Sequence, residues 1–204
     1  KFSVRFIYES NAIEGSKLAE SEVASIVENK YVKKSIPQKE IIEVHNSIKC
    51  FERLSSGEFI LNQKNLKSLH ANLVEGLDIP NGFKKQDIVV NNKETVSPKE
   101  VRQELTKLFS WYRSSSTQLH PFERAIIFHN TFEHIHPFTD GNGRVGRLLL
   151  NWMLLEKGYG FILFKNNNKT AYISALDKAD EGRYRNLLKL STNTYHNTIK
   201  EFCN

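Results

Sequence analysis

The sequence has little cysteine and almost no methionine. Its 204 residues include two cysteines, Cys50 and Cys203, which lie far apart and without CxxC spacing. This pattern argues against a disulfide framework and against a cysteine zinc site, and it fits thiols in a reducing compartment. The single methionine is Met153, so we expect the chain to begin inside a longer protein or after processing.

Long apolar runs are also missing. The longest apolar stretch, Leu148 to Leu155, is interrupted by Asn151. It is too short to cross a bilayer, which takes about 20 residues. Residues 1–10 have no continuous apolar segment of the kind that a secretion signal carries. We therefore expect a soluble, cytoplasmic chain that is not associated with a membrane.

Charge of one sign is not concentrated in any segment. The net charge is +6, and the lysines are scattered among glutamates without a stripe of interleaved aromatic residues. This distribution argues against direct nucleic-acid binding, although a modest positive potential would attract an anionic nucleotide. Nothing in the composition indicates low complexity, so the length predicts a single domain over residues 1–204.

Apolar residues recur at helical spacing through most of the chain, which predicts an all-α fold. The exception is the segment between Gly82 and Asn92, where the β-branched run Ile88 to Val90 predicts one short β-hairpin. We expect helices after Pro37, after Asn62, from the start signal Ser97-Pro98-Lys99-Glu100, from Pro121, from the turn at 141–143, across Thr170 to Ala179 and across Arg183 to Phe202.

Residues 136–147, HPFTDGNGRVGR, combine a histidine, an acidic residue, a glycine-bracketed turn and two arginines. His136 provides an imidazole whose ordinary pKa is near neutral, which suits a general base. Asp140 provides a hard carboxylate of the kind that binds Mg²⁺ beside phosphates. The motif therefore offers both a proton acceptor and a metal ligand.

The turn within this motif is suited to bind a polyphosphate because it opens a helix. The N–H groups of Gly141, Asn142 and Gly143 can point at phosphate oxygens, and the helix dipole adds to the attraction. Arg144 and Arg147 are three positions apart, so they share one helix face and each can bind a phosphate with a planar guanidinium.

Two other interpretations of these residues are weaker. The glycines also match GxGxxG, but that dinucleotide-binding motif needs a preceding strand, and the residues before it have helical spacing. His129, His134 and His136 lie close in sequence, but their spacing does not fit a metal site on one helix face. We expect His129 and His70 to be hydrogen-bonded core residues.

The motif resembles the Fic signature HxFx[D/E]GNGRxxR, and every fixed position is filled. The resemblance extends through EGSKL, LHANLVEGL, GFKKQDIVV, HPFERAIIFHNTFEHIHPF and AYISALDKADEGRY. It implies a Fic fold that transfers AMP from ATP, with Mg²⁺, to a Ser, Thr or Tyr hydroxyl of a target protein. The implied roles are His136 as base, Asp140 on Mg²⁺, Asn142 with the backbone turn on the α-phosphate, Arg144 on the β-phosphate and Arg147 on the γ-phosphate.

Residues 10–15, SNAIEG, resemble a second Fic pattern, [S/T]xxxE[G/N], which marks an inhibitory helix. The resemblance implies that residues 1–16 form this region and that Glu14 pairs with Arg147 in place of the γ-phosphate. Ser10 and Glu14 are four apart and project from one helix face, and Gly15 suits a helix end. The alternative is an ordinary polar pair on a surface helix.

The segment with Phe83, Lys84 and Ile88 resembles the Fic flap, whose edge pairs with an extended target peptide. Fic proteins often carry arginine where this chain has Lys84, and lysine cannot form a forked pair of hydrogen bonds. An ordinary surface hairpin is therefore the alternative. The segment with Tyr172, Leu176 and Leu187 resembles the part of Fic domains that closes around adenine.

Three questions stay open at this stage. Some Fic proteins with the inhibitory glutamate also remove AMP, and Glu14 would then activate water. Other transferred groups, and a binding module in which His136 is idle, are further alternatives. The sequence also allows a homodimer without specifying one.

Overall fold

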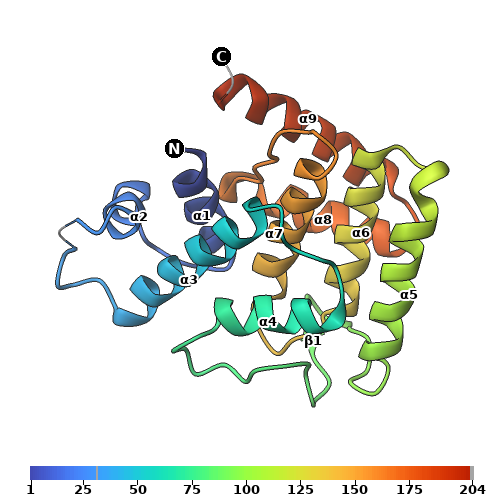
Figure 1. The fold of residues 1–204 in the computed structure, drawn as a ribbon, viewed down its shortest axis with the longest axis horizontal. Coiled ribbons are helices and arrows are strands. Elements are labelled where there is room, and N and C mark those ends of the chain that lie inside the picture. Colours follow the sequence, from blue (N-terminus) through green and yellow to red (C-terminus); the bar gives the residue numbers. More distant parts are fainter. Residues whose placement is uncertain (31, 203–204) are drawn as a thin grey trace.

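The structure is a computed structural model that describes residues 1–30 and 32–202. It is mostly helical, with one two-stranded antiparallel hairpin in the described part (Figure 1). The predicted fold class is confirmed. The elements are α1 (Phe2–Ile13), α2 (Glu20–Val27), α3 (Gln38–Ser55), α4 (Gln63–Leu73), β1 (Val89–Val90), β2 (Lys93–Glu94), α5 (Val101–Ser114), η1 (Ser115–Thr117), α6 (Pro121–Ile135), α7 (Asn142–Leu155), η2 (Asn166–Asn168), α8 (Lys169–Asp180) and α9 (Arg185–Phe202).

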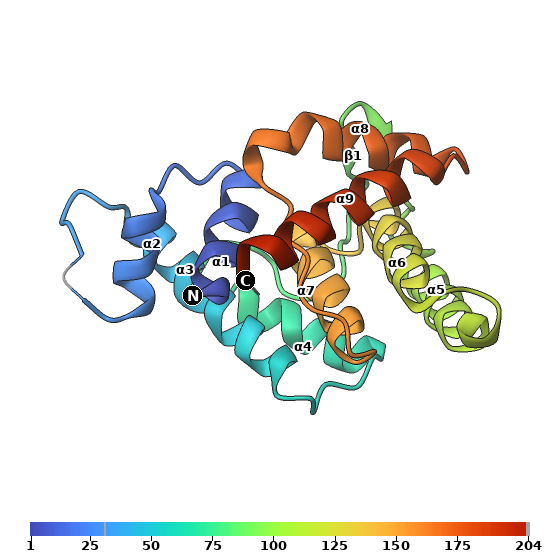
Figure 2. The same cartoon turned by 90° about the horizontal axis from the view of Figure 1, so that it is seen from above.

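The helix α7 is the centre of the fold. Between Asn142 and Leu154 every residue except Gly143 is buried. A helix that is buried on all sides belongs to a core. The helices α1, α3, α4 and α6 contact it (Figures 1 and 2). Its N-terminal turn is therefore held rigidly by neighbours on several sides.

The helix α1 is anchored at its first turn and at its middle. Near the start, the Phe2 ring stacks on Phe161 at 4.2 Å and meets Phe202 edge-on at 5.1 Å. Further along, the buried carboxylate of Glu9 accepts a hydrogen bond from Asn166 N at 2.7 Å and forms an ion pair with Arg5 Nη2 at 2.9 Å. The residues of α1 that follow are thereby placed against α7.

The hairpin lies later in the chain than predicted. We expected it between Gly82 and Asn92, but its strands are Val89–Val90 and Lys93–Glu94. The reason is the Asn91-Asn92 pair, in which both residues have positive φ, 51° and 62°. Two left-handed residues in succession form a tight hairpin turn, so the second strand must follow them.

The start of α5 also differs from the prediction. The helix begins at Val101 rather than at Pro98. The Ser97 hydroxyl donates to Glu100 Oε2 at 2.6 Å instead of capping a backbone N–H, and residues 98–100 form a turn. The other predicted helices are confirmed, with ends that shift by one or two residues.

A capping interaction at the start of α4 gives a first prediction. Asn62 Oδ1 accepts a hydrogen bond from Asn65 N at 2.8 Å. The variant Asn62→Ala loses this acceptor, and we expect its free energy of unfolding to fall by about 1 kcal/mol in urea denaturation. Asn62→Asp keeps an acceptor and serves as the control. Equal midpoints for all three proteins would contradict the assignment.

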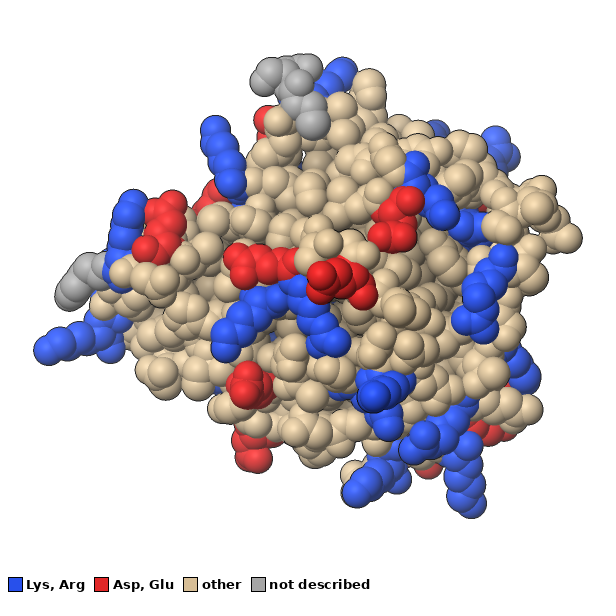
Figure 3. All heavy atoms as spheres, in the orientation of Figure 1, with Lys and Arg blue, Asp and Glu red and all other residues tan. Residues whose placement is uncertain are grey.

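The surface carries charges of both signs. On the face in Figure 3 they are interspersed, and a group of basic side chains gathers along the lower edge, over the region of β1 and the start of α5. Within residues 1–30 and 32–202, no helix combines the length and apolar character needed to cross a membrane.

Candidate active site

The candidate site is built on the loop between α6 and α7. His136 ends α6 in the left-handed conformation, with φ 49° and ψ 61°. Gly141 precedes α7 with φ +81°, where an added Cβ would also lie 3.3 Å from Leu73 Cδ2. Glycine adopts this conformation without the strain that a side chain would cause. The backbone thus turns sharply at both ends of the loop.

The loop is braced from within by Asn142. Its Nδ2 donates to Phe138 O at 2.8 Å, and its Oδ1 accepts from Phe138 N at 2.9 Å. The side chain is therefore occupied with loop backbone, whereas the resemblance placed it on the α-phosphate. What faces outward is backbone: the N–H groups of Asn142, Gly143 and Arg144 begin the helix and have no intrahelical acceptor.

His70 supports the same loop from α4. Its ring stacks on Phe138 at 3.8 Å with an interplanar angle of 3°, and its Nε2 lies 2.9 Å from Asp140 O. Burial lowers the pKa of His70, so the ring stays neutral. The prediction that His70 is a hydrogen-bonded core residue is confirmed. Asp140 itself remains half-exposed, with 54% of its side-chain surface accessible.

Arg147 packs against the C-terminal end of α1. Its Nη2 donates to Glu14 Oε1 at 2.6 Å and to Ser10 O at 3.0 Å, and its Nε donates to Ser10 Oγ at 2.9 Å. Arg147 is 3% exposed. The structure therefore brings together the three residues that the two sequence patterns linked, and it ends α1 at Ile13 with Gly15 at φ +103°.

The Glu14 carboxylate also lies against the first turn of α7. A Cβ added to Gly143 would overlap Glu14 Oε1 and would approach Arg147 Nη1 to 2.9 Å. Only glycine at position 143 leaves room for this arrangement. The carboxylate thus stands beside the free N–H groups, in the space that an anion bound there would need.

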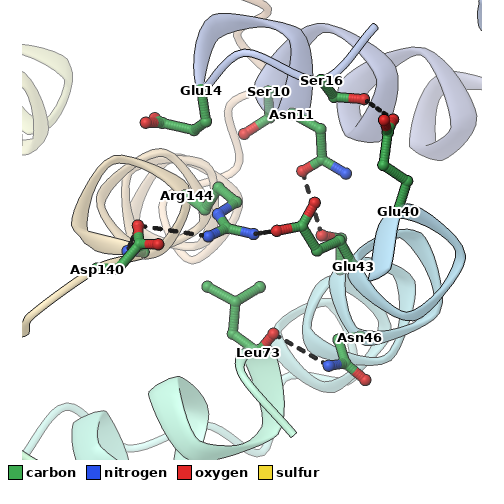
Figure 4. A network of polar contacts seen from close by, with 12 residues as sticks. Ser10, Asn11, Glu14, Ser16, Glu40, Glu43, Asn46, Leu73, Asp140 and Arg144 are labelled. Carbon is green, nitrogen blue, oxygen red and sulfur yellow. Dashed lines mark hydrogen bonds and ion pairs between the residues drawn. The ribbon is translucent and has the colours of Figure 1, made fainter. Parts of the chain in front are cut away.

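Arg144 has a different and looser set of partners. Its Nη1 lies 3.4 Å from Glu43 Oε1 on α3, and its Nη2 lies 3.6 Å from Asp140 Oδ1 (Figure 4). Arg144 is 4% exposed, and its Nε has no hydrogen-bond partner among the described residues. A buried guanidinium with long contacts retains unused donors. Sequence reasoning did not identify Glu43, because a glutamate on an amphipathic helix carries no signal of such a contact.

His136 lines a hollow between the hairpin and α8. Burial, followed by the charge of Lys84, lowers the pKa of His136 to about 4. The imidazole is therefore neutral at pH 7 and able to accept a proton. Residues that line the hollow with His136 include Val90, Thr95, Glu133, Leu176 and Asp180.

The segment expected to close around adenine only partly reaches this hollow. Leu176 lines it, whereas Tyr172 and Leu187 lie in the core. The Tyr172 hydroxyl lies 2.5 Å from His129 Nε2, and both side chains are buried. The prediction that His129 is a hydrogen-bonded core residue is confirmed.

The flap residues are not all on the surface. Lys84 was expected to face a target, but it is 3% exposed and points inward. The Phe83 ring packs against Phe138 at 5.7 Å, with the guanidinium of Arg102 5.4 Å from its centroid. Ile88 is half-buried. The pattern of residue types predicted exposure because lysine is rarely buried.

Glu133 is a partly buried carboxyl that sequence reasoning also missed. Its Oε1 has no hydrogen-bond partner among the described residues and lies 3.9 Å from His129 Nδ1. A Cβ on Gly146 would overlap it, which explains the glycine. Burial raises the pKa of Glu133 to about 8, against an opposing effect of Arg147.

This raised pKa predicts that Glu133→Gln increases the free energy of unfolding by an amount that depends on the pH. In the wild type the unfolded carboxyl ionises near its ordinary pKa of 4.5 while the folded one stays protonated up to about 8, so stability falls as the pH rises between these values. Glutamine does not ionise, so the variant does not lose stability in this pH range. We expect the variant to be more stable by about 2 kcal/mol above pH 8 and by much less near pH 4.5 in urea denaturation. An equal difference at both pH values would contradict the buried neutral carboxyl.

Comparison with known proteins identifies the domain. The Fic/DOC family model matches residues 60–154, which contain α6, the loop and most of α7. A solved structure of a Fic domain containing signaling protein from Bacteroides thetaiotaomicron matches with a TM-score of 0.90 at 22% identity, over 98% of this chain and 84% of that one. This chain contains a Fic domain.

Curated relatives of the Fic domain are longer proteins. A probable protein adenylyltransferase of Aquifex aeolicus is 40% identical over 136 residues, which are 66% of this chain and 42% of that protein. The protein adenylyltransferase Fic of Nematostella vectensis is 28% identical over 206 residues, covering 96% and 48% respectively. The chain thus spans less than half the length of these relatives.

Proposed function

We propose that this Fic domain is a protein adenylyltransferase that transfers AMP from ATP to a Ser, Thr or Tyr hydroxyl of a target protein. The observation that carries the proposal is a neutral, partly buried histidine beside a helix N-terminus that presents free N–H groups and two buried arginines. The names of the curated relatives support the same activity. We propose further that residues 1–204 act as one domain, with residues 1–16 as its inhibitory region.

The triphosphate binds at the start of α7. The backbone N–H groups of residues 142–144 and the helix dipole hold the α-phosphate. Arg144, whose donors are incompletely used, takes the β-phosphate, and Arg147 takes the γ-phosphate once Glu14 withdraws. The adenosine extends into the hollow that His136 and Leu176 line.

The transfer step needs one proton acceptor and one leaving group. His136 takes the proton of the target hydroxyl as its oxygen forms a bond to the α-phosphorus. The bond from the α-phosphorus to the bridging oxygen breaks, and pyrophosphate leaves with the electron pair. The proton passes from His136 to the leaving group or to solvent. The arginines and N–H groups stabilise the charge that moves onto the leaving oxygens.

Asp140 fits the role of a Mg²⁺ ligand. Its carboxylate is half-exposed at the mouth of the site, and its Oδ1 accepts from Gly141 N, while no residue in 1–30 or 32–202 donates a hydrogen bond to Oδ2. In the described part of the chain no three acidic, His or Cys side chains gather into a metal cage. A single carboxylate is nevertheless the usual protein share when phosphates supply other ligands. Bound there, Mg²⁺ would neutralise phosphate charge.

Glu14 restrains the transferase in this proposal. Its carboxylate uses the Nη2 of Arg147 and stands beside the N–H groups of α7. ATP that binds under these conditions lacks its γ-phosphate contact and lies in a different orientation. The restraint is partial, because 36% of the Glu14 side chain is exposed and the pair is open to water.

The target is a protein that presents a hydroxyl beside the hairpin. Val89 on β1 is 62% exposed, so an extended segment of the target has an accessible edge to pair with. The cytoplasmic location and a homodimer remain predictions.

The test uses the purified chain with glycine in place of Glu14, ATP and Mg²⁺. We expect mass spectrometry to detect AMP on the protein itself or on proteins of a native lysate. If neither this variant nor the wild type adds AMP to any protein, the transferase proposal fails and a binding module is favoured.

A second candidate activity is removal of AMP. The position of Glu14 favours it, because a partly exposed carboxylate beside the phosphate-binding N–H groups can activate a water molecule. Incubating an AMP-modified protein with the wild-type chain and Mg²⁺, but without ATP, tests this activity. Release of AMP that depends on Glu14 supports it, and intact modified protein argues against it.

A further inference from the structure

Lys84 is a buried lysine without an ion-pair partner in the described part of the chain. Its Nζ donates to Thr95 Oγ1 at 2.5 Å and to Ile135 O at 3.4 Å. Burial lowers the pKa of Lys84 to about 8, and the negative charge of Asp87 offsets only part of this shift. A lysine is seldom buried in this way unless its charge or its hydrogen bonds are needed.

The contacts of Lys84 fall on both sides of His136. Its side chain reaches the carbonyl of Ile135, and its backbone N–H donates to Pro137 O at 2.9 Å. The residue between these two carbonyls is the left-handed His136. One residue therefore fixes the peptide groups that determine where the imidazole points.

The third contact of Lys84 ties the base of the hairpin to the same place. Thr95 Oγ1, which accepts from Lys84, donates to Ile88 O at 2.8 Å, and Thr95 N donates to the same carbonyl at 3.2 Å. Ile88 and Thr95 flank the two strands. A displacement of the hairpin is thus transmitted to Lys84 through these partly buried hydrogen bonds.

Lys84 also acts on His136 through its charge. The groups that affect the pKa of His136 are Lys84, which lowers it, and the carboxylates of Glu14 on α1 and Asp140 in the loop, which raise it. A hydrogen bond with the Glu133 backbone raises it too. Burial is the largest cause of the lowered pKa of His136, and Lys84 is the cation that adds to it, so removing Lys84 should raise this pKa although burial continues to lower it.

We propose that Lys84 is a positioning residue that couples the hairpin to the general base: it fixes the orientation of His136 and places a cation near its ring. The inference rests on the proposed function of His136. It assigns Lys84 a role in the geometry of the base instead of in contact with the target. A target seated on the hairpin then meets a base that is already aligned.

The experiment compares three substitutions in the Glu14→Gly protein. Lys84→Met removes the charge and keeps the length, Lys84→Arg keeps the charge, and Lys85→Met alters the exposed neighbour as a control. For Lys84→Met we expect kcat for AMP transfer to fall about tenfold with little change in KM for ATP. We expect the acid limb of its pH–rate profile to move up by about one pH unit, because His136 loses a nearby cation. Lys84→Arg should restore the acid limb, and Lys85→Met should change neither quantity.

A separate readout keeps the inference testable without activity. NMR titration of the His136 ring in the wild-type and Lys84→Met proteins measures its pKa directly, and we expect a higher value in the variant. If Lys84→Met does not fold, Lys84→Gln also removes the charge with a shorter polar side chain and is measured in the same way. An unchanged ring pKa and an unchanged acid limb would overturn the inference. If the parent protein transfers no AMP but the ring pKa responds, the proposed function fails and the coupling stands.

Discussion

Replacing Glu14 by glycine should raise the rate of AMP transfer about 10- to 100-fold. The carboxylate holds Arg147 at 2.6 Å, and its withdrawal frees a buried guanidinium for the γ-phosphate. A fully buried pair would be worth about 3–5 kcal/mol when broken, but the partial exposure of Glu14 reduces this to about 1.5–3 kcal/mol. Each 1.4 kcal/mol corresponds to about a tenfold change in rate.

The measurement is the initial rate of AMP incorporation at saturating ATP. Glu40→Gln is a matched control, because Glu40 lines the same side of the site and accepts a hydrogen bond from Ser16 without touching either arginine (Figure 4). It should leave the rate unchanged. Equal rates for wild type and Glu14→Gly would exclude restraint by Glu14 while leaving the transferase in place.

Replacing His136 by alanine should reduce the rate of the Glu14→Gly protein by about 100-fold or more, the usual contribution of general base catalysis. The N–H groups and both arginines remain, so ATP affinity should stay within about twofold, since the phosphate contacts provide most of the binding. Transfer assays together with calorimetric titration of ATP separate the two effects.

One outcome of the His136→Ala experiment would contradict the role of His136 as the base. A His136→Ala protein that binds ATP and still transfers AMP at the parent rate would show that the base is another group. Loss of both binding and transfer would instead mean that the loop has collapsed, since His136 ends α6 in a left-handed conformation.

The sequence was sufficient for features that depend on local pattern. Helical periodicity predicted the fold, and the motif predicted a sharp turn at Gly141 that opens α7. The contact between Glu14 and Arg147, 133 positions apart, was expected only from resemblance to a family. No local pattern of apolar spacing or turn chemistry could have predicted it.

Other features depend on tertiary packing that the sequence does not encode locally. Glu43 lies 101 positions before Arg144, and in the sequence it resembles an ordinary surface residue of a helix. Lys84 and Glu133 are residue types that are usually exposed, so their burial was not predicted. The hydrogen bonds of the Asn142 side chain to Phe138 were not predicted, because a motif gives residue identities and not which atoms are already bonded.

The way α1 is fastened limits how the site can be switched on. Its first turn belongs to an aromatic cluster with residues from the far end of the chain, and Glu9 locks its middle to the segment before α8. Detaching the whole helix would expose that cluster to water. Activation by departure of the helix would therefore destabilise the fold of the domain. We expect any natural activator to swing a single carboxylate aside while the rest of the helix stays docked.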